Sequence, residues 1–333
     1  MQALISGTSY VVQRDDLAFL SLPHFSANDY ESALNCMQQR YDRFPDDVET
    51  IKNIGVCLGR LNRHGETVKW LDIAVGLTPD DPVIYDTLDR AYHHLGDHVA
   101  FKAHGERALS IKDSQAAAQR PIRSLEKVQI PPFNRDEPRR NIIAFSLWGQ
   151  AERYCNGAVR NAEMVNEIYP GWHCRFYCGE TVPKDTVGRL IALGTDVVML
   201  PPQAEMYEGL FWRFRVASDP GIDRYLIRDA DSVLNVRERA AVFEWLPSDR
   251  HFHILRDYPT HTDPMLAGLW GGVRGALPDL SHRARKYLAD VTKTSNCDQK
   301  FLREVVWPVA RQSYVLYQRQ ELLTCVCPIS HSD

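Results

Sequence analysis

The sequence predicts an α/β fold: all-α helical hairpins in the first third, followed by a domain built on a mostly parallel β-sheet. A repeat of 34 residues predicts the hairpins, and a regular alternation of strand and helix patterns after Asn141 predicts the sheet. A pair of carboxylates after a buried strand, Asp229 and Asp231, marks the expected site. We divide the 333 residues into a helical domain at 1–118, a linker at 119–140 and a sheet domain at 141–333.

The repeat appears when the segment that begins at Val48 is aligned with the one that begins at Pro82. Ile54 then aligns with Leu88, and a degenerate earlier copy lies around Tyr30. The 34-residue period resembles the tetratricopeptide repeat (TPR) family over residues 16–114. This resemblance implies stacked helical hairpins, none of which buries its apolar face alone. Such a stack implies either a surface for a protein partner or a short helical cap.

Residues 116–141 contain four prolines and five arginines and show no sustained apolar period, so we expect a linker. After it, strand patterns alternate with helix patterns. The expected strands are 141–149, 172–179, 195–201, 224–232, 252–258 and 267–275, and the expected helices are 156–169, 184–194, 205–218 and 237–246, with two more after the last strand. This order predicts helices on both faces of the sheet and a ligand site at the carboxyl ends of the strands.

Composition narrows the class of protein. The chain is 44% hydrophobic and 25% charged, as in ordinary globular proteins, and its net charge of -4 gives no general reason to expect nucleic-acid binding. No apolar run approaches the ~18 residues of a membrane span, and the first residues lack the pattern of a secretory signal. The eight cysteines are scattered, mostly within apolar patterns, which predicts reduced thiols and a cytoplasmic protein.

Asp229 and Asp231 follow the apolar strand residues Tyr225 to Ile227. Since alternate residues of a strand point to the same side, we expect the two carboxylates to converge on one point. A divalent cation between them would relieve their repulsion, and hard oxygen ligands suit Mg²⁺ or Mn²⁺. The alternative is that the two aspartates only cap the following turn.

The segment "RDADS" after an apolar strand resembles the Asp-X-Asp motif of nucleotide-sugar glycosyltransferases with the GT-A fold, a Rossmann-like fold. "LAGLWGGVRG" and "NCDQKFL" resemble later segments of the same family, and the resemblance covers residues 141–308. It implies an enzyme that uses Mn²⁺ or Mg²⁺ to transfer a sugar from a nucleoside-diphosphate sugar. Among such donors, the resemblance favours a UDP-sugar. The acceptor would be a glycan or a protein.

The resemblance also implies roles for single residues. Asp229 and Asp231 would bind the metal, with His331 as a third ligand. Asp298 would contact the sugar or act as general base, unless it caps the helix that it begins; Asp257 is a second candidate base.

Further donor contacts are expected at the turn after the first strand, at arginines that match phosphate geometry, and at glycines that let substrate approach the backbone. These residues are Trp148, Gly149, Arg213, Arg228, Gly271 and Gly272. For the glycines, the alternative is a kink in the strand.

Two other functions compete with this interpretation. An apolar strand followed by Asp-X-Asp-Ser also resembles the haloacid-dehalogenase phosphohydrolases, in which the first aspartate is the nucleophile. That motif normally opens its domain, whereas three strand-helix units precede it here. The third hypothesis is a non-enzymatic TPR scaffold fused to a catalytically silent α/β domain.

Overall fold

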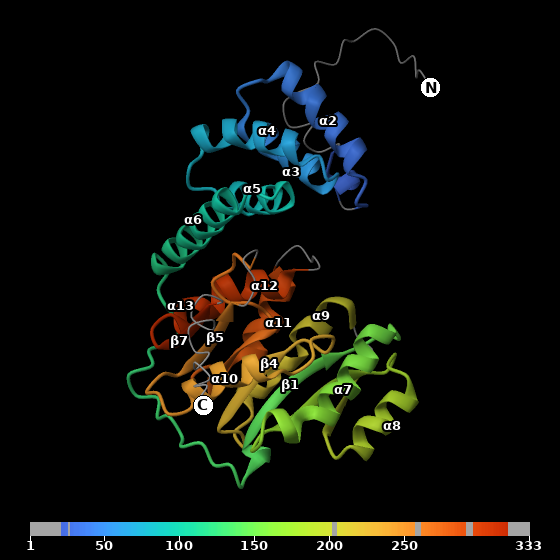
Figure 1. Cartoon of the computed structure of the whole chain (residues 1–333), viewed down its shortest axis with the longest axis vertical. Coiled ribbons are helices and arrows are strands. Elements are labelled where there is room, and N and C mark those ends of the chain that lie inside the picture. Colours follow the sequence, from blue (N-terminus) through green and yellow to red (C-terminus); the bar gives the residue numbers. More distant parts are fainter. Residues whose placement is uncertain (1–20, 26, 202–204, 257–260, 291–295, 319–333) are drawn as a thin grey trace, which may run out of the picture. The chain divides into compact units, whose positions relative to one another are not determined.

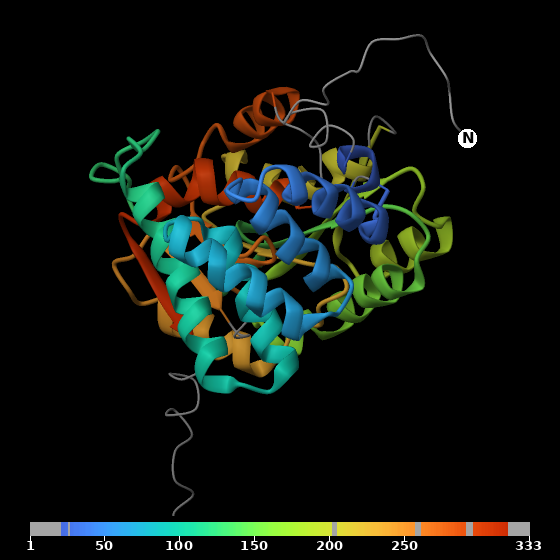
Figure 2. The same ribbon diagram turned by 90° about the horizontal axis from the view of Figure 1, so that it is seen from above.

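The structure, a computed structural model, describes residues 21–25, 27–201, 205–256, 261–290 and 296–318. The chain forms two compact units, Met1–Lys112 and Asp113–Asp333 (Figures 1 and 2). None of the helices in the described ranges combines the length and the hydropathy that a membrane crossing requires.

The first unit consists of successive antiparallel helices. They are α2 (Tyr30–Arg43), α3 (Val48–Arg60), α4 (His64–Leu77), α5 (Pro82–Leu95) and α6 (His98–Ala117), the last of which continues into the second unit. The starts of α3 and α5 are 34 residues apart, as are the starts of α4 and α6, so the predicted repeat is confirmed. Asp47 and Asp81 cap α3 and α5 at equivalent positions. Figure 2 shows these helices side by side.

The second unit is built on a seven-stranded sheet of order β3-β2-β1-β4-β6-β5-β7. Its strands are β1 (Asn141–Leu147), β2 (His173–Gly179), β3 (Asp196–Leu200), β4 (Arg224–Arg228), β5 (Phe252–Arg256), β6 (Leu269–Val273) and β7 (Tyr314–Gln318). Among the strands in the described residues, only β6 runs antiparallel to its neighbours, so the expectation of a mostly parallel sheet is confirmed. β7 was not among the expected strands.

Helices cover both faces of this sheet. They include α7 (Glu152–Ile168), α8 (Lys184–Ala192), α9 (Glu205–Trp212), η2 (Arg213–Ser218), α10 (Val236–Trp245), α11 (Leu280–Asp290), α12 (Cys297–Phe301) and α13 (Trp307–Ala310). On β4, the side chain of Arg228 pairs with Glu238 of α10. The adjacent residue, Ile227, is paired across the strands with Trp270 of β6, and the ring of Trp270 packs on Phe214 of η2. Because neighbouring strand residues face opposite ways, α10 and η2 lie on opposite faces.

Residues 119–140 do not form the linker that the sequence predicted, because they pack against the sheet unit. Leu125 is buried in the core of the sheet unit, and Val128, Ile130 and Phe133 pack against that core. The carbonyl of Val128 lies 2.9 Å from His251 Nε2, which ties the segment to the sheet. Residues 119–140 therefore form a strap on the second unit, and the boundary between the units falls at Lys112, before the strap begins.

Candidate functional site

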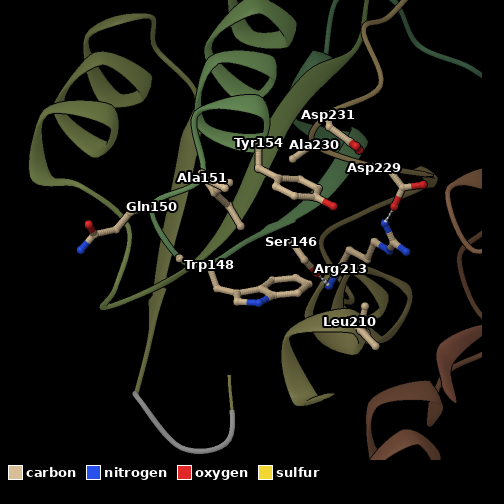
Figure 3. A pocket seen from close by; sticks show the side chains of 12 residues that line it. Ser146, Trp148, Gln150, Ala151, Tyr154, Leu210, Arg213, Asp229, Ala230 and Asp231 are labelled. Carbon is tan, nitrogen blue, oxygen red and sulfur yellow. Dashed lines mark hydrogen bonds and ion pairs between the residues drawn. The ribbon is translucent and has the colours of Figure 1, made fainter. Parts of the chain in front are cut away.

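A pocket of about 560 Å³ opens at the carboxyl ends of β1 and β4 (Figure 3). The order of the strands reverses between these two, since β2 and β3 lie beyond β1, and β6, β5 and β7 lie beyond β4. Open α/β sheets bind ligands at such a switch point. The pocket is lined by Ser146, Leu147, Trp148, Gly149, Gln150, Ala151, Tyr154, Leu210, Arg213, Asp229, Ala230 and Asp231.

Asp229 is held by a buried arginine. Arg213, 4% exposed at the start of η2, donates through one terminal nitrogen to Asp229 Oδ1 and through the other to Asp298 Oδ2, at 3.2 Å. Its backbone N–H donates to Ser146 Oγ of β1 at 2.9 Å. Burial alone would lower the pKa of Arg213, but the charges of Asp229 and Asp298 outweigh it and raise that pKa. Arg213 is thus a fixed cation at the wall of the pocket.

Asp231 is held by a different arginine. Its Oδ2 lies 2.5 Å from a terminal nitrogen of Arg153, in the first turn of α7; the Arg153 side chain is 77% exposed and that of Asp231 only 12%. The strand alternation from which we expected the two carboxylates to converge does not reach Asp231, because the chain turns here: Ser232 N–H donates to the carbonyl of Asp229 at 3.1 Å. Both carboxylates still line one pocket, each paired with an arginine of a different element.

Two residues of α7 hold this acidic turn in place. The side-chain amide of Asn161, fully buried, donates to the carbonyls of Ala230 (3.3 Å) and Ser232 (3.1 Å) and accepts from Leu234 N–H (2.8 Å). One helical turn earlier, a Cβ at Gly157 would collide with the carbonyl of Ala230, so only glycine lets α7 approach so closely. The sequence prediction missed both, although their spacing of four residues on one helix face was the available signal.

Asp298 and Gln299, the "DQ" of "NCDQKFL", support residues around the pocket without lining it themselves. Asp298 is 5% exposed and binds Arg213; burial raises the pKa of its carboxyl, and Arg213 opposes that rise. Gln299 donates to the carbonyl of Met265 and accepts from Ala267 N–H at 2.9 Å. The N-cap position of α12 is held by Asn296, whose side chain makes no capping hydrogen bond, and Asp298 lies within the helix. The structure therefore places Asp298 behind Arg213, away from the lining of the pocket.

Trp148 and Gly149 form the pocket wall after β1, as expected from the sequence. Gly149 has a φ of +72° and donates its N–H to Thr181 Oγ1 at 2.7 Å. The ring of Trp148 lies against Gly209 of α9, where a Cβ would meet it. With Tyr154 it supplies aromatic surface to the pocket (Figure 3).

Three predicted donor contacts are wrong. Arg228 is 1% exposed, and its Nε donates to Glu238 at 2.9 Å on the sheet face opposite η2, because its side chain alternates with that of Ile227. At Gly271 and Gly272, the space that a Cβ would take is filled by the neighbouring strands, so the glycines serve strand packing. Asp257 and His331 lie outside the described residues.

The acidic turn fits a divalent metal in part. Within the described ranges, no group of three or more His, Cys, Asp or Glu side chains is placed to hold an ion. Asp229 and Asp231 supply hard carboxylate oxygens at an open pocket. Mg²⁺ commonly binds through one or two carboxylates and completes its shell with water and substrate phosphates. The donor set therefore suits an ion that completes its coordination with water and with the phosphates of a ligand.

Comparison with known proteins gives short or distant similarities. No family model matches the chain. FlbA of Caulobacter vibrioides is 38% identical over 53 residues, which are 16% of this chain and 9% of FlbA. An O-GlcNAc transferase of Thermobaculum terrenum is similar over 67% of this chain and 47% of its own, with 16% identity and a TM-score of 0.34. PcrH of Pseudomonas aeruginosa is similar over 35% of this chain and 86% of its own, with 18% identity and a TM-score of 0.29.

Proposed function

We propose that the chain is a glycosyltransferase of the GT-A type, which uses a nucleoside-diphosphate sugar and a divalent cation, Mn²⁺ or Mg²⁺. One observation supports it above the others: the Asp229–Asp231 turn, a buried arginine and an aromatic wall border one pocket at the switch point of the sheet. Each part matches one part of such a donor. A base can lie against the aromatic wall, and a diphosphate can lie beside the charges.

The residues divide the work in this proposal. Trp148 and the Gly149 turn receive the nucleobase, and Asp229 and Asp231 hold the cation. When bound, that cation neutralises charge on the diphosphate as it leaves. Arg213 keeps Asp229 in one position through its contacts with Asp298 and the β1 strand. A charge that is already fixed in position does not have to reorient during the reaction. This preorganisation is a main source of electrostatic catalysis in enzymes.

The phosphohydrolase alternative fits the same residues less well. Its nucleophile would be Asp229, whose carboxylate must be free to attack phosphorus. Here Oδ1 accepts a hydrogen bond from the buried Arg213, and Oδ2 lies against Gly268, while the side chain as a whole is 48% exposed. A carboxylate oxygen of Asp229 can therefore still offer a lone pair to a cation, but the hydrogen-bonded carboxylate is poorly placed to attack phosphorus and form a covalent bond.

The helical unit adds a binding role to the proposal. Stacked repeats of this length present the side chains of successive helices on one extended surface. PcrH, a distant structural neighbour, is seen in complex with the chaperone-binding region of PopD. We propose that the hairpins of this chain bind a protein, which is either the acceptor or a separate partner.

A thermal-shift screen tests the donor and metal together. Nucleoside diphosphates and their sugars are added to the protein with Mn²⁺ or with a chelator, and binding to the folded state raises the melting temperature by mass action. We expect a rise with one nucleotide class that needs the metal and disappears in Asp229→Ala and Asp231→Ala. A metal-dependent rise of the same size in both variants would remove the acidic turn from the proposal.

A further inference from the structure

The two arginines that neutralise the acidic turn differ in how firmly they are held. Arg213 has a side chain that is 5% exposed, and it also binds Asp298 and the carbonyl of Arg228 at 3.2 Å each. Arg153 has a side chain that is 77% exposed, at the second position of α7. Beside its ion pair with Asp231, it lies only over the ring of Tyr154, 5.7 Å from the centroid. Only Arg153 can leave its carboxylate without the loss of a buried network.

We propose that Arg153 is an exchangeable counter-ion of the acidic turn. It neutralises Asp231 when the pocket is empty, a divalent cation displaces it, and the released guanidinium then binds the diphosphate of the donor. This inference rests on the proposed function, since it assigns a step to the same site. The exchange requires only the exposed Arg153 side chain to change rotamer, since its contacts among the described residues are those with Asp231 and the neighbouring Tyr154.

The exchange is reasonable on energetic grounds. An ion pair with one exposed member contributes little, because solvent screens it and two long side chains lose freedom. A divalent cation is commonly bound by one or two carboxylates together with phosphate oxygens, which is the donor set that a displaced Arg153 would leave. The guanidinium fork that leaves Asp231 matches the oxygens of a phosphate group. Tyr154 lines the pocket, and the guanidinium of Arg153 lies over its ring, so Arg153 starts from a position beside the pocket.

The inference predicts that the substitution Arg153→Gln changes the affinities for Mn²⁺ and for UDP in opposite directions. In Arg153→Gln, Mn²⁺ alone should bind about two- to five-fold more tightly, because its competitor is gone. UDP added in saturating Mn²⁺ should bind about three- to tenfold more weakly, because a phosphate contact is gone. Both constants can be measured by calorimetric titration of the full chain. A residue that only supports the fold would weaken both ligands together.

Arg160→Gln is the matched control, because Arg160 is exposed on the same helix two turns later and its loss changes the net charge equally. It should leave both constants unchanged. Unchanged or weaker Mn²⁺ binding in Arg153→Gln, with normal binding by the wild type, overturns the exchange and leaves the proposed function standing. A wild-type protein that binds neither Mn²⁺ nor a nucleoside diphosphate overturns both.

Discussion

At the scale of single residues, buried arginines pair with carboxylates on both faces of the sheet around β4. Arg213 pairs with Asp229 and Asp298 on the pocket side, and Arg228 pairs with Glu238 on the other. Removal of one partner from a buried pair leaves an uncompensated charge and is strongly destabilising. The buried pairs Arg213–Asp298 and Arg228–Glu238 are therefore similar in energetic character, but only Arg213 lines the pocket.

This similarity gives a controlled prediction. Asp298→Asn and Glu238→Gln should each lower the free energy of unfolding by about 3 kcal/mol, measured by denaturant titration. Only Asp298→Asn should also weaken metal-dependent binding of the donor nucleotide, because it frees Arg213 to shift and Asp229 to move with it. Equal losses of affinity in the two variants would mean that the effect comes from stability alone.

The sequence located the acidic turn and Arg213, but it could not assign the partners. Asp229 and Asp231 were recognisable because charge after a buried strand is unusual, whereas the strand alternation used to argue their convergence ends at a turn. The prediction that Arg228 contacts the donor was wrong, because a shift of one position along a strand moves a side chain to the other face of the sheet. Asn161 was missed because a buried amide in an amphipathic helix looks like a surface residue in the sequence.

A buried carboxylate in the helical unit gives a prediction of pH dependence. Asp89 of α5 is 1% exposed, and burial together with the charge of Asp86 raises its pKa to about 7. A raised folded-state pKa favours the protonated carboxyl, so the stability of this unit should fall as the pH rises from about 4 to about 7. Asp89→Asn should remove most of this fall, measured by hydrogen exchange of peptides from α3 to α5. An identical pH profile in the variant would contradict it.

At the scale of elements, α7 links three parts of the site. Its first turn carries Arg153 and Tyr154, and its middle holds the acidic turn through Gly157 and Asn161. The helix and its strand neighbours were predictable, since their apolar periods differ. The close approach to Ala230 was not, because a glycine within a helical pattern gives no sign of what lies against it.

This close approach predicts the effect of one added methyl group. Gly157→Ala should push the acidic turn away from α7 and weaken metal-dependent nucleotide binding, although alanine is the better helix former. Gly188→Ala in α8 is the control, since nothing lies within 4 Å of its added Cβ, and it should keep binding intact. The measurement is calorimetric titration with Mn²⁺ present. Wild-type affinity in Gly157→Ala would show that the turn does not depend on this contact.

At the scale of the whole molecule, the chain is a repeat unit and a sheet unit with a boundary earlier than the sequence suggested. The 34-residue period was visible because every repeat uses the same apolar positions. The strap at 119–140 was not, because its few apolar residues, such as Leu125 and Phe133, bind one at a time to a surface that only the folded sheet provides. Asp113 also binds Arg311 and the indole N–H of Trp307, which anchors the start of this unit.

The strap predicts how the chain can be cut. A fragment of residues 113–333 should unfold in one cooperative transition, whereas a fragment of residues 141–333 should be unstable or insoluble. The buried Leu125 contributes on the order of 1.5–3 kcal/mol and the partly buried Val128, Ile130 and Phe133 contribute less each, so their joint loss is a large fraction of the stability of a typical domain. Circular dichroism during heating distinguishes the two fragments. A cooperative transition of equal midpoint in the shorter fragment would restore a linker.

The most direct test of the central claim is the titration of a nucleoside-diphosphate sugar into the full chain, with Mn²⁺ and again with a chelator. The acidic turn at the switch point predicts binding that requires the cation and that is lost in Asp231→Asn, while Arg160→Gln binds as the wild type does. Equal binding of the donor by the wild type with and without the cation, unchanged in Asp231→Asn, would contradict it.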